Sequence, residues 1–94
     1  MNREELNSII IRYLKNYHVD RVGIFGSFAR NKNRKDSDLD LLIRFKKNPT
    51  LLQLVKIERE LSELLGIKVD IVTEPSITDS LLKENIEKDL QIIF

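Results

Sequence analysis

The chain has 94 residues, 41% of them hydrophobic and 33% charged, a composition that predicts one soluble globular domain over residues 1–94 and excludes a disordered or membrane-spanning chain. The absence of cysteine and the single His18 exclude disulfides, thiolate nucleophiles and multi-histidine metal sites. The net charge of +1 indicates no broad nucleic-acid surface, and the polar first residues, with no apolar run of about 20 residues, predict a cytoplasmic protein.

The first half of the chain predicts one helix and two strands. Apolar residues with helical spacing predict an amphipathic helix over about residues 3–17, with Asn2 at its start. A β-prone run at 21–25 stops at Gly26, and a short turn of helix is expected to follow it. Residues 39–45 are apolar on both faces after Asp40, which predicts a central strand.

The second half predicts two helices around a third strand. Asn48 and Pro49 are interpreted as N-cap and first helical position of a helix that ends at Gly66. Residues 67–72 alternate with period two as a strand, and a last helix is expected over about 78–89. The apolar tail 91–94 is expected either to pack on the sheet or to contact another chain. The positions expected to face inward are Leu51, Leu54, Val55, Leu61, Leu64 and Leu65 in the second helix, and Leu81, Leu82 and Ile86 in the last.

This order of elements predicts the fold class. Helices alternate with three strands, so we expect an α/β (α+β) domain in which a small mixed β-sheet is covered by helices. The connections are short, which leaves little room for lids. The active surface is therefore expected to be shallow and open.

Two aspartates stand at the start of the second strand. Asp38 and Asp40 are two residues apart, so their side chains leave the same face of a strand, with Cα atoms about 6.6 Å apart. Such close carboxylates raise each other's pKa unless a cation neutralises them, and hard oxygen ligands suit Mg²⁺. A solvated pair of surface acids is the alternative for an isolated Asp-x-Asp.

A Gly-Ser pair precedes these aspartates. Gly26 ends a strand where a helical turn begins, and there backbone amides attract phosphate oxygens and a glycine lets a phosphate approach. Ser27 is expected to cap the turn, to donate to a phosphate, or both. Arg30 follows one turn later on the same face and is positioned to reach a triphosphate.

Asp70 is the one acid within the apolar strand 67–72, where a charge is costly unless it is paired or functional. If this strand lies beside the Asp38–Asp40 strand, all three carboxylates face the same metals. Three acids beside a phosphate cradle describe a two-metal centre for nucleotidyl transfer.

Charge is concentrated near these motifs. Residues 30–47 contain seven basic and three acidic side chains, a local charge of +4, whereas residues 58–94 contain four basic and nine acidic side chains, a charge of −5. This segment is expected to frame the open side of the site, and it suits a small polyanion better than duplex DNA.

Gly26-Ser27, ten intervening residues, and then Asp38-x-Asp40 resembles the signature of the minimal nucleotidyltransferases of the DNA polymerase beta-like superfamily. The resemblance covers essentially the whole chain. It implies that fold, with Gly26, Ser27 and Arg30 binding nucleotide and Asp38, Asp40 and Asp70 as metal ligands and catalytic residues. Asn31 stands where many members have glycine, and asparagine also tolerates a left-handed turn.

The resemblance also implies a function. Small members of this family commonly serve as antitoxins that transfer AMP from ATP, with two Mg²⁺ ions, to a tyrosine of a HEPN-domain ribonuclease toxin. Asp70 is the expected general base. We expect another chain to present the acceptor, no direct contact with nucleic acid, and either homo- or hetero-oligomers. The alternatives are a non-catalytic antitoxin that acts by binding, and a small-molecule adenylyltransferase that acts as a dimer.

Overall fold

The computed structural model describes residues 1–94, except for the side chain of residue 76. Its helices are α1 (Arg3–Leu14), α2 (Leu51–Leu65) and α3 (Ser80–Asp89), and single 3-10 turns follow α1 and β3 at Lys15–Tyr17 and Glu74–Ser76. The strands are β1 (Val19–Phe25), β2 (Leu39–Phe45), β3 (Val69–Thr73) and β4 (Gln91–Ile92). No helix in this described part of the chain is both long and apolar enough to cross a membrane.

The four strands form one mixed sheet in the order β3-β2-β1-β4. β1 pairs antiparallel with β2 and β4, whereas β2 and β3 are parallel. The prediction of a small mixed sheet with helices is confirmed, and β2 is an interior strand as expected.

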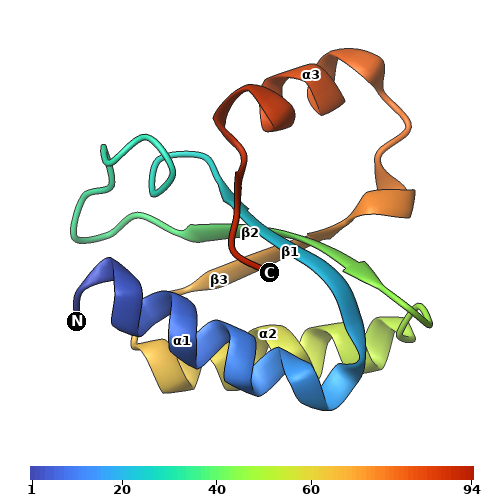
Figure 1. The fold of residues 1–94 in the computed structure, drawn as a ribbon, viewed down its shortest axis with the longest axis horizontal. Coiled ribbons are helices and arrows are strands. Elements are labelled where there is room, and N and C mark those ends of the chain that lie inside the picture. The colour runs from blue at the N-terminus through green and yellow to red at the C-terminus, as the bar shows by residue number, and fades with distance from the viewer.

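The two faces of the sheet have different partners. Leu39, Leu41 and Ile43 of β2 point to the face that α1 and α2 cover, and all three are fully buried there. Because strand side chains alternate, Asp40 and Leu42 point to the opposite face, where α3 lies (Figure 1). The main core therefore fills one side of the sheet, and the other side carries Asp40 together with the buried side chains of Leu42 and Ile86.

Helix α2 starts later than the sequence predicted. Its N-cap is Thr50, whose hydroxyl accepts from the Gln53 amide at 3.2 Å while the Gln53 side chain accepts from the Thr50 amide at 2.9 Å. This reciprocal capping box satisfies two otherwise unpaired donors. The assignment of Asn48 and Pro49 as cap and first helical position is therefore wrong, whereas the end of the helix at Gly66 is confirmed.

The inward face of α2 was predicted only in part. Leu61 and Leu65 are buried and Leu54 packs against the core, but Leu51, Val55 and Leu64 are exposed. Ile57, which the prediction missed, is fully buried. The buried positions 57, 61 and 65 form one stripe at a spacing of four, and the exposed leucines and valine lie outside that stripe.

The predicted inward face of α3 is wrong at two of three positions. Ile86 is buried, but Leu81 and Leu82 remain at least half exposed. Figure 1 shows the reason: only the end of α3 near β4 approaches the sheet, and the first turn lies away from it.

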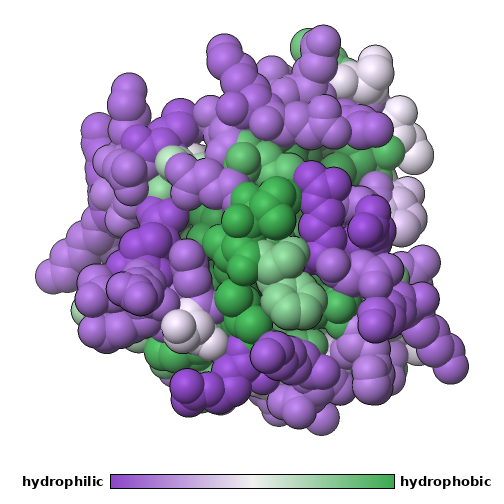
Figure 2. All heavy atoms as spheres, in the orientation of Figure 1, coloured by the Kyte–Doolittle hydropathy of each residue, from purple (hydrophilic) through white to green (hydrophobic). Residues whose placement is uncertain are grey.

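The apolar C-terminal tail adds a strand to the sheet. β4 pairs with Gly23 and Ile24 of β1, and the Val22 amide donates to the Phe94 carbonyl at 3.2 Å. Of the two expected outcomes, packing on the sheet is the one observed. Ile92 and Phe94 are still about half exposed. Figure 2 shows apolar side chains gathered at the centre of the molecular surface that faces the viewer in Figure 1.

Replacement of Ile57 by alanine tests the observed helix face. Ile57→Ala is expected to lower the free energy of unfolding by about 2–5 kcal/mol, because it leaves a cavity in the core. Val55→Ala, on the same helix but 53% exposed, is expected to change it by no more than about 0.5 kcal/mol. Urea denaturation of both variants measures the difference, and equal losses would contradict the observed helix orientation.

Candidate active site

A row of residues crosses three strands at one end of the sheet. In the strand register Asp40 of β2 lies directly opposite Phe25 of β1 on one side and Asp70 of β3 on the other. The expectation that the third strand lies beside the Asp40 strand is confirmed. Asp40 and Asp70 are both half-buried, and they lie on the sheet face that α1 and α2 leave uncovered.

Gly26 follows this row directly and touches it. Its φ of +75° lies in the left-handed region, and a Cβ added to it would collide with Oδ2 of Asp40. Both facts require glycine at this position. The backbone of the turn therefore approaches the Asp40 carboxylate more closely than any side-chain-bearing residue would allow.

The segment after Gly26 is a single helical turn that closes at Asn31. The Arg30 amide donates to the Gly26 carbonyl at 3.2 Å, and the Lys32 amide donates to the Ser27 carbonyl at 2.9 Å. Asn31 has φ of +56°, the left-handed residue of a Schellman ending. Asparagine thus ends the turn in the left-handed conformation, as the sequence predicted.

The start of this turn presents free amides. Among the described residues, no hydrogen bond uses the backbone N–H groups of Ser27, Phe28 and Ala29 or the Ser27 hydroxyl. The predicted capping role of Ser27 is therefore not observed. Unpaired amides at the start of a helical turn attract anions, so the turn has the groups that a phosphate requires.

Two side chains that the sequence analysis missed hold the other end of the turn. The Arg3 guanidinium donates to the Phe28 carbonyl and lies over the Phe28 ring, and the Gln91 amide donates to the Ala29 carbonyl at 2.8 Å. They come from α1 and β4, so opposite ends of the chain fix one turn. Their sequence spacing carries no signal of this contact.

Arg30 lies at the site but is paired with another residue. Its guanidinium donates to Asp89 of α3 at 2.6 Å, and its charge acts on Asp40. Asp89 was not predicted as a site residue. A sequence signal for it exists, since an acid in the last turn of a helix opposes the helix dipole unless a cation compensates it.

Asp38 is close to Asp40 but has its own partner, because Lys68 lies 3.7 Å from its Oδ2. Within the described residues, no three acid or histidine side chains already surround one metal position. The donor set still fits a hard divalent cation, because Asp40 and Asp70 are adjacent carboxylates that no described hydrogen bond or ion pair neutralises. Such an ion would complete its shell with water or phosphate oxygens.

The electrostatics of Asp40 support this arrangement. Partial burial raises the pKa of Asp40, and the charges of Asp70 and Asp38 raise it further, whereas Arg30 acts in the opposite direction. An acid whose neighbours are also acids is the situation that a bound cation relieves.

Only part of the basic segment 30–47 lies at this site. Lys32, Arg34 and Lys35 belong to the exposed loop between the turn and β2. Arg44 lies near the opposite end of β2, where it pairs with Asp20 and Glu74, each at 3.8 Å, and Lys46 and Lys47 follow it. The expectation that the whole segment frames the site is therefore wrong, because β2 carries its second half away.

Sequence comparison gives the first relationship to known proteins. Residues 6–93 match the nucleotidyltransferase domain family. MJ1217 of Methanocaldococcus jannaschii, provisionally named a protein adenylyltransferase, is 41% identical over 90 residues, which are 92% of each chain. The protein adenylyltransferase MntA of Thermococcus cleftensis is 36% identical over 84 residues, which are 85% of each chain.

Solved structures share the fold. A provisionally assigned minimal nucleotidyltransferase superposes with a TM-score of 0.79 at 35% identity, over 97% of this chain and 95% of the other. A toxin–antitoxin complex with AMP-PNP gives 0.85 at 18% identity, over 94% and 72%. A tri-AMPylated HEPN toxin with its MNT antitoxin from Shewanella oneidensis gives 0.80 at 16% identity, over 99% and 72%. The last two likenesses concern the fold alone.

The raised pKa of Asp40 predicts that its ionised carboxylate lowers the free energy of unfolding at neutral pH. The folded state binds the Asp40 proton more tightly than the unfolded chain does, so stability falls as pH rises through the folded pKa. Asp40→Asn removes this charge and is expected to increase the free energy of unfolding at neutral pH. The increase should shrink as pH is lowered toward about 3.9, the pKa of an unperturbed aspartate.

The matched control is Asp36→Asn, which removes the same charge from the exposed loop and should leave stability unchanged. Denaturation curves across this pH range make the comparison. An Asp40→Asn variant that is less stable than the wild type at neutral pH would show that the carboxylate stabilises the fold.

Proposed function

The chain belongs to the nucleotidyltransferase domain family, and we propose that it is an Mg²⁺-dependent protein adenylyltransferase that serves as an antitoxin. In this proposal it transfers AMP from ATP to a tyrosine of a HEPN-domain toxin. Relatives named protein adenylyltransferases support the reaction class. The complexes of MNT antitoxins with HEPN toxins, which share the fold, support the type of partner.

The observation that carries the proposal is the contact between the Gly26 turn and Asp40, which with its neighbour Asp70 forms the acidic row. The turn meets the Asp40 carboxylate at Gly26, the amides that follow Gly26 have no hydrogen bond among the described residues, and Asp40 lies beside Asp70. A triphosphate on the Gly26 turn, against the unpaired amides that begin at Ser27, would have its α-phosphate near both carboxylates. One anion-binding group and two acids in this order match the needs of transfer from a nucleoside triphosphate.

The reaction assigns a task to each group. The tyrosine oxygen attacks the α-phosphorus, its bond to phosphorus forms, and the bond to the β-phosphate bridging oxygen breaks, so pyrophosphate leaves. Asp70 takes the hydroxyl proton as attack begins. Arg30 exchanges its contact with Asp89 for the phosphates, which keeps its charge compensated in both states.

Asp38, Asp40 and Asp70 would hold the two Mg²⁺ ions, which supply positive charge to the phosphates and to the developing charge of the leaving group. Asp38 joins this set when its weak, exposed pair with Lys68 opens.

The open sheet face suits an acceptor that is delivered by another chain. The acidic row is half-buried, and α1 and α2 lie on the opposite face of the sheet (Figure 1). The exposed cations Lys32, Arg34 and Lys35, in the loop that joins the Gly26 turn to β2, would meet an acidic partner surface. AMP on the toxin tyrosine would add a negative phosphate and steric bulk where RNA binds, which explains neutralisation.

Replacement of Asp70 tests the reaction. Asp70→Asn is expected to retain ATP binding but to lower the rate of transfer by about 10²–10⁴, because the base is lost. Asp36→Asn, an exposed acid of the loop, should transfer at the wild-type rate. Mass spectrometry of a HEPN-domain toxin, incubated with each variant, ATP and Mg²⁺, counts the AMP groups added.

The Asp38→Ala/Asp40→Ala double variant separates catalysis from simple binding. It is expected to leave the toxin unmodified and active. Full neutralisation by this variant, together with no adduct from the wild type, would make the protein a binding antitoxin and not an enzyme.

Removal of metal tests the role of the carboxylates. ATP is expected to bind more tightly with Mg²⁺ than with excess chelator, because phosphates and carboxylates share the ion. Calorimetry of wild type and Asp40→Asn measures this gain, which should be lost in the variant. Equal ATP affinity of the wild type with and without metal would exclude a metal-bridged site.

A further inference from the structure

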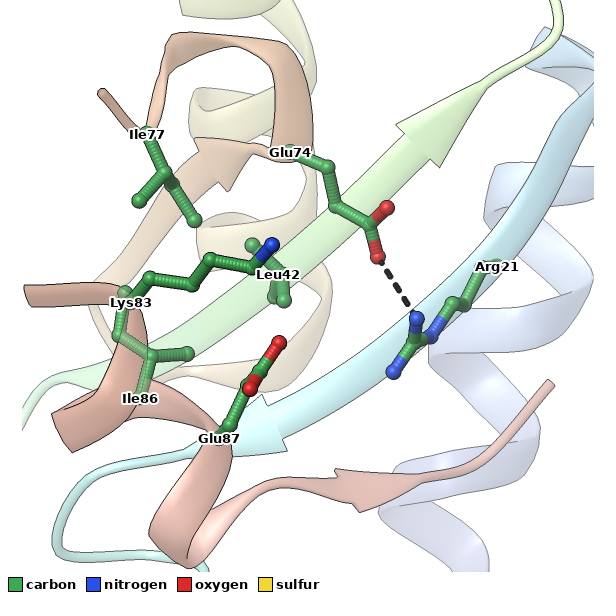
Figure 3. A pocket seen from close by; sticks show the side chains of 7 residues that line it. All are labelled: Arg21, Leu42, Glu74, Ile77, Lys83, Ile86 and Glu87. Atoms are coloured by element: carbon green, nitrogen blue, oxygen red, sulfur yellow. Dashed lines mark ion pairs between the residues drawn. The ribbon is translucent and has the colours of Figure 1, made fainter. Parts of the chain in front are cut away.

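A pocket lies on the same sheet face as the acidic row, farther along β2. Its volume is about 180 Å³, and its lining residues are Arg21, Leu42, Glu74, Ile77, Lys83, Ile86 and Glu87. Figure 3 shows that they come from β1, β2, the turn after β3, and α3. The reaction proposed above gives none of them a task.

The alternation of side chains along β2 places the pocket next to the candidate active site. Asp40 and Leu42 are successive residues on one face of β2, so the pocket floor begins about 6.6 Å from Asp40 along the strand. Arg44, the next residue on that face, pairs with Glu74 at the far end. The pocket therefore extends from the candidate phosphate site toward the opposite end of β2.

The lining combines an apolar floor with a polar rim. Leu42 and Ile86 are each only 4% exposed, and Ile77 forms a further apolar wall. Glu74 is held by Arg21 at 3.3 Å, which closes one side (Figure 3). The side chains of Lys83 and Glu87, one helical turn apart on α3, form no ion pair or hydrogen bond among the described residues, so a donor and an acceptor remain available.

We propose that this pocket binds the nucleobase of ATP. The inference rests on the proposed function, since it assigns the base once the triphosphate lies on the Gly26 turn. A purine is flat and apolar on its faces and polar at its edge, as the pocket is. The ribose joins the base to the α-phosphate, which the proposed function places near Asp40. The base must therefore lie one sugar length from that end of β2.

The size of the pocket favours the base alone. Pockets for drug-sized ligands measure about 300–1,000 Å³, so about 180 Å³ is too small for a whole nucleotide. The Glu87 carboxylate accepts from the amino group of adenine, and the Lys83 ammonium donates to a ring nitrogen.

The test measures the affinity of ATP and of inorganic triphosphate, each with Mg²⁺, by calorimetry. Wild type should bind ATP more tightly, because only ATP has a base. Glu87→Met and Lys83→Met should each weaken ATP binding at least about tenfold, the value of one hydrogen bond to a charged group, and leave triphosphate affinity unchanged. Methionine is a good helix former, so α3 is preserved.

The matched controls are Glu84→Met and Lys88→Met, which remove the same charges from exposed positions of α3 that do not line the pocket. They should bind ATP as the wild type does. Unchanged ATP affinity in both pocket variants would overturn the base assignment and leave the proposed function standing.

Two further outcomes are distinct. Pocket variants that keep ATP affinity but slow transfer to the toxin would assign the pocket to the acceptor chain and overturn the proposal. A wild type that binds neither ATP nor triphosphate would overturn the proposed function, and the base pocket with it.

Discussion

The register of three strands at one end of the sheet is the constraint on which the candidate site depends. Antiparallel pairing sets Phe25 opposite Asp40, and parallel pairing sets Asp70 opposite Asp40. A shift of either pairing by one residue would turn a carboxylate into the apolar core. The buried residues on both sides of Asp40, Leu39 and Leu41, oppose such a shift, so the core that stabilises the fold also positions the acids.

The Gly26 turn is anchored by side chains at its end and has unpaired backbone groups at its start. Arg3 and Gln91 satisfy carbonyls at the end of the Gly26 turn, whereas the amides that follow Gly26 have no hydrogen-bond partner within the described part of the chain. Close acids and unpaired amides both cost stability. The metal–nucleotide complex that we propose would satisfy both.

The sequence predicted the parts of the fold that depend on local periodicity. The strand at 39–45, the stop at Gly66 and the left-handed Asn31 all follow from residue types within a few positions. Predictions failed where one local signal competed with another, as with Asn48–Pro49 against the Thr50 capping box, or where the outcome depended on packing. The exposure of Leu81 and Leu82 belongs to the second kind, because it depends on how far α3 stands from the sheet.

The candidate site shows the same division. Gly26, Ser27, Asp38 and Asp40 were predicted from their spacing, and Asp70 from its charge in an apolar strand. The contacts of Arg30 with Asp89 and of Arg3 with the turn link residues 59 and 25 positions apart, and only the tertiary structure reveals them. The position of the basic segment 30–47 was predicted wrongly. Net charge along the sequence does not show that β2 carries the second half of this segment away from the site.

We propose that the Gly26 turn and the Asp40–Asp70 pair together bind a metal-bound triphosphate. Diffraction from crystals grown with Mn²⁺ and a non-hydrolysable ATP analogue, with anomalous maps to locate manganese, tests it most directly. Manganese is expected in contact with the Asp40 and Asp70 carboxylates, and phosphate oxygens are expected against the amides of the Gly26 turn. A nucleotide bound elsewhere on the molecule, with no manganese between these aspartates, would contradict it.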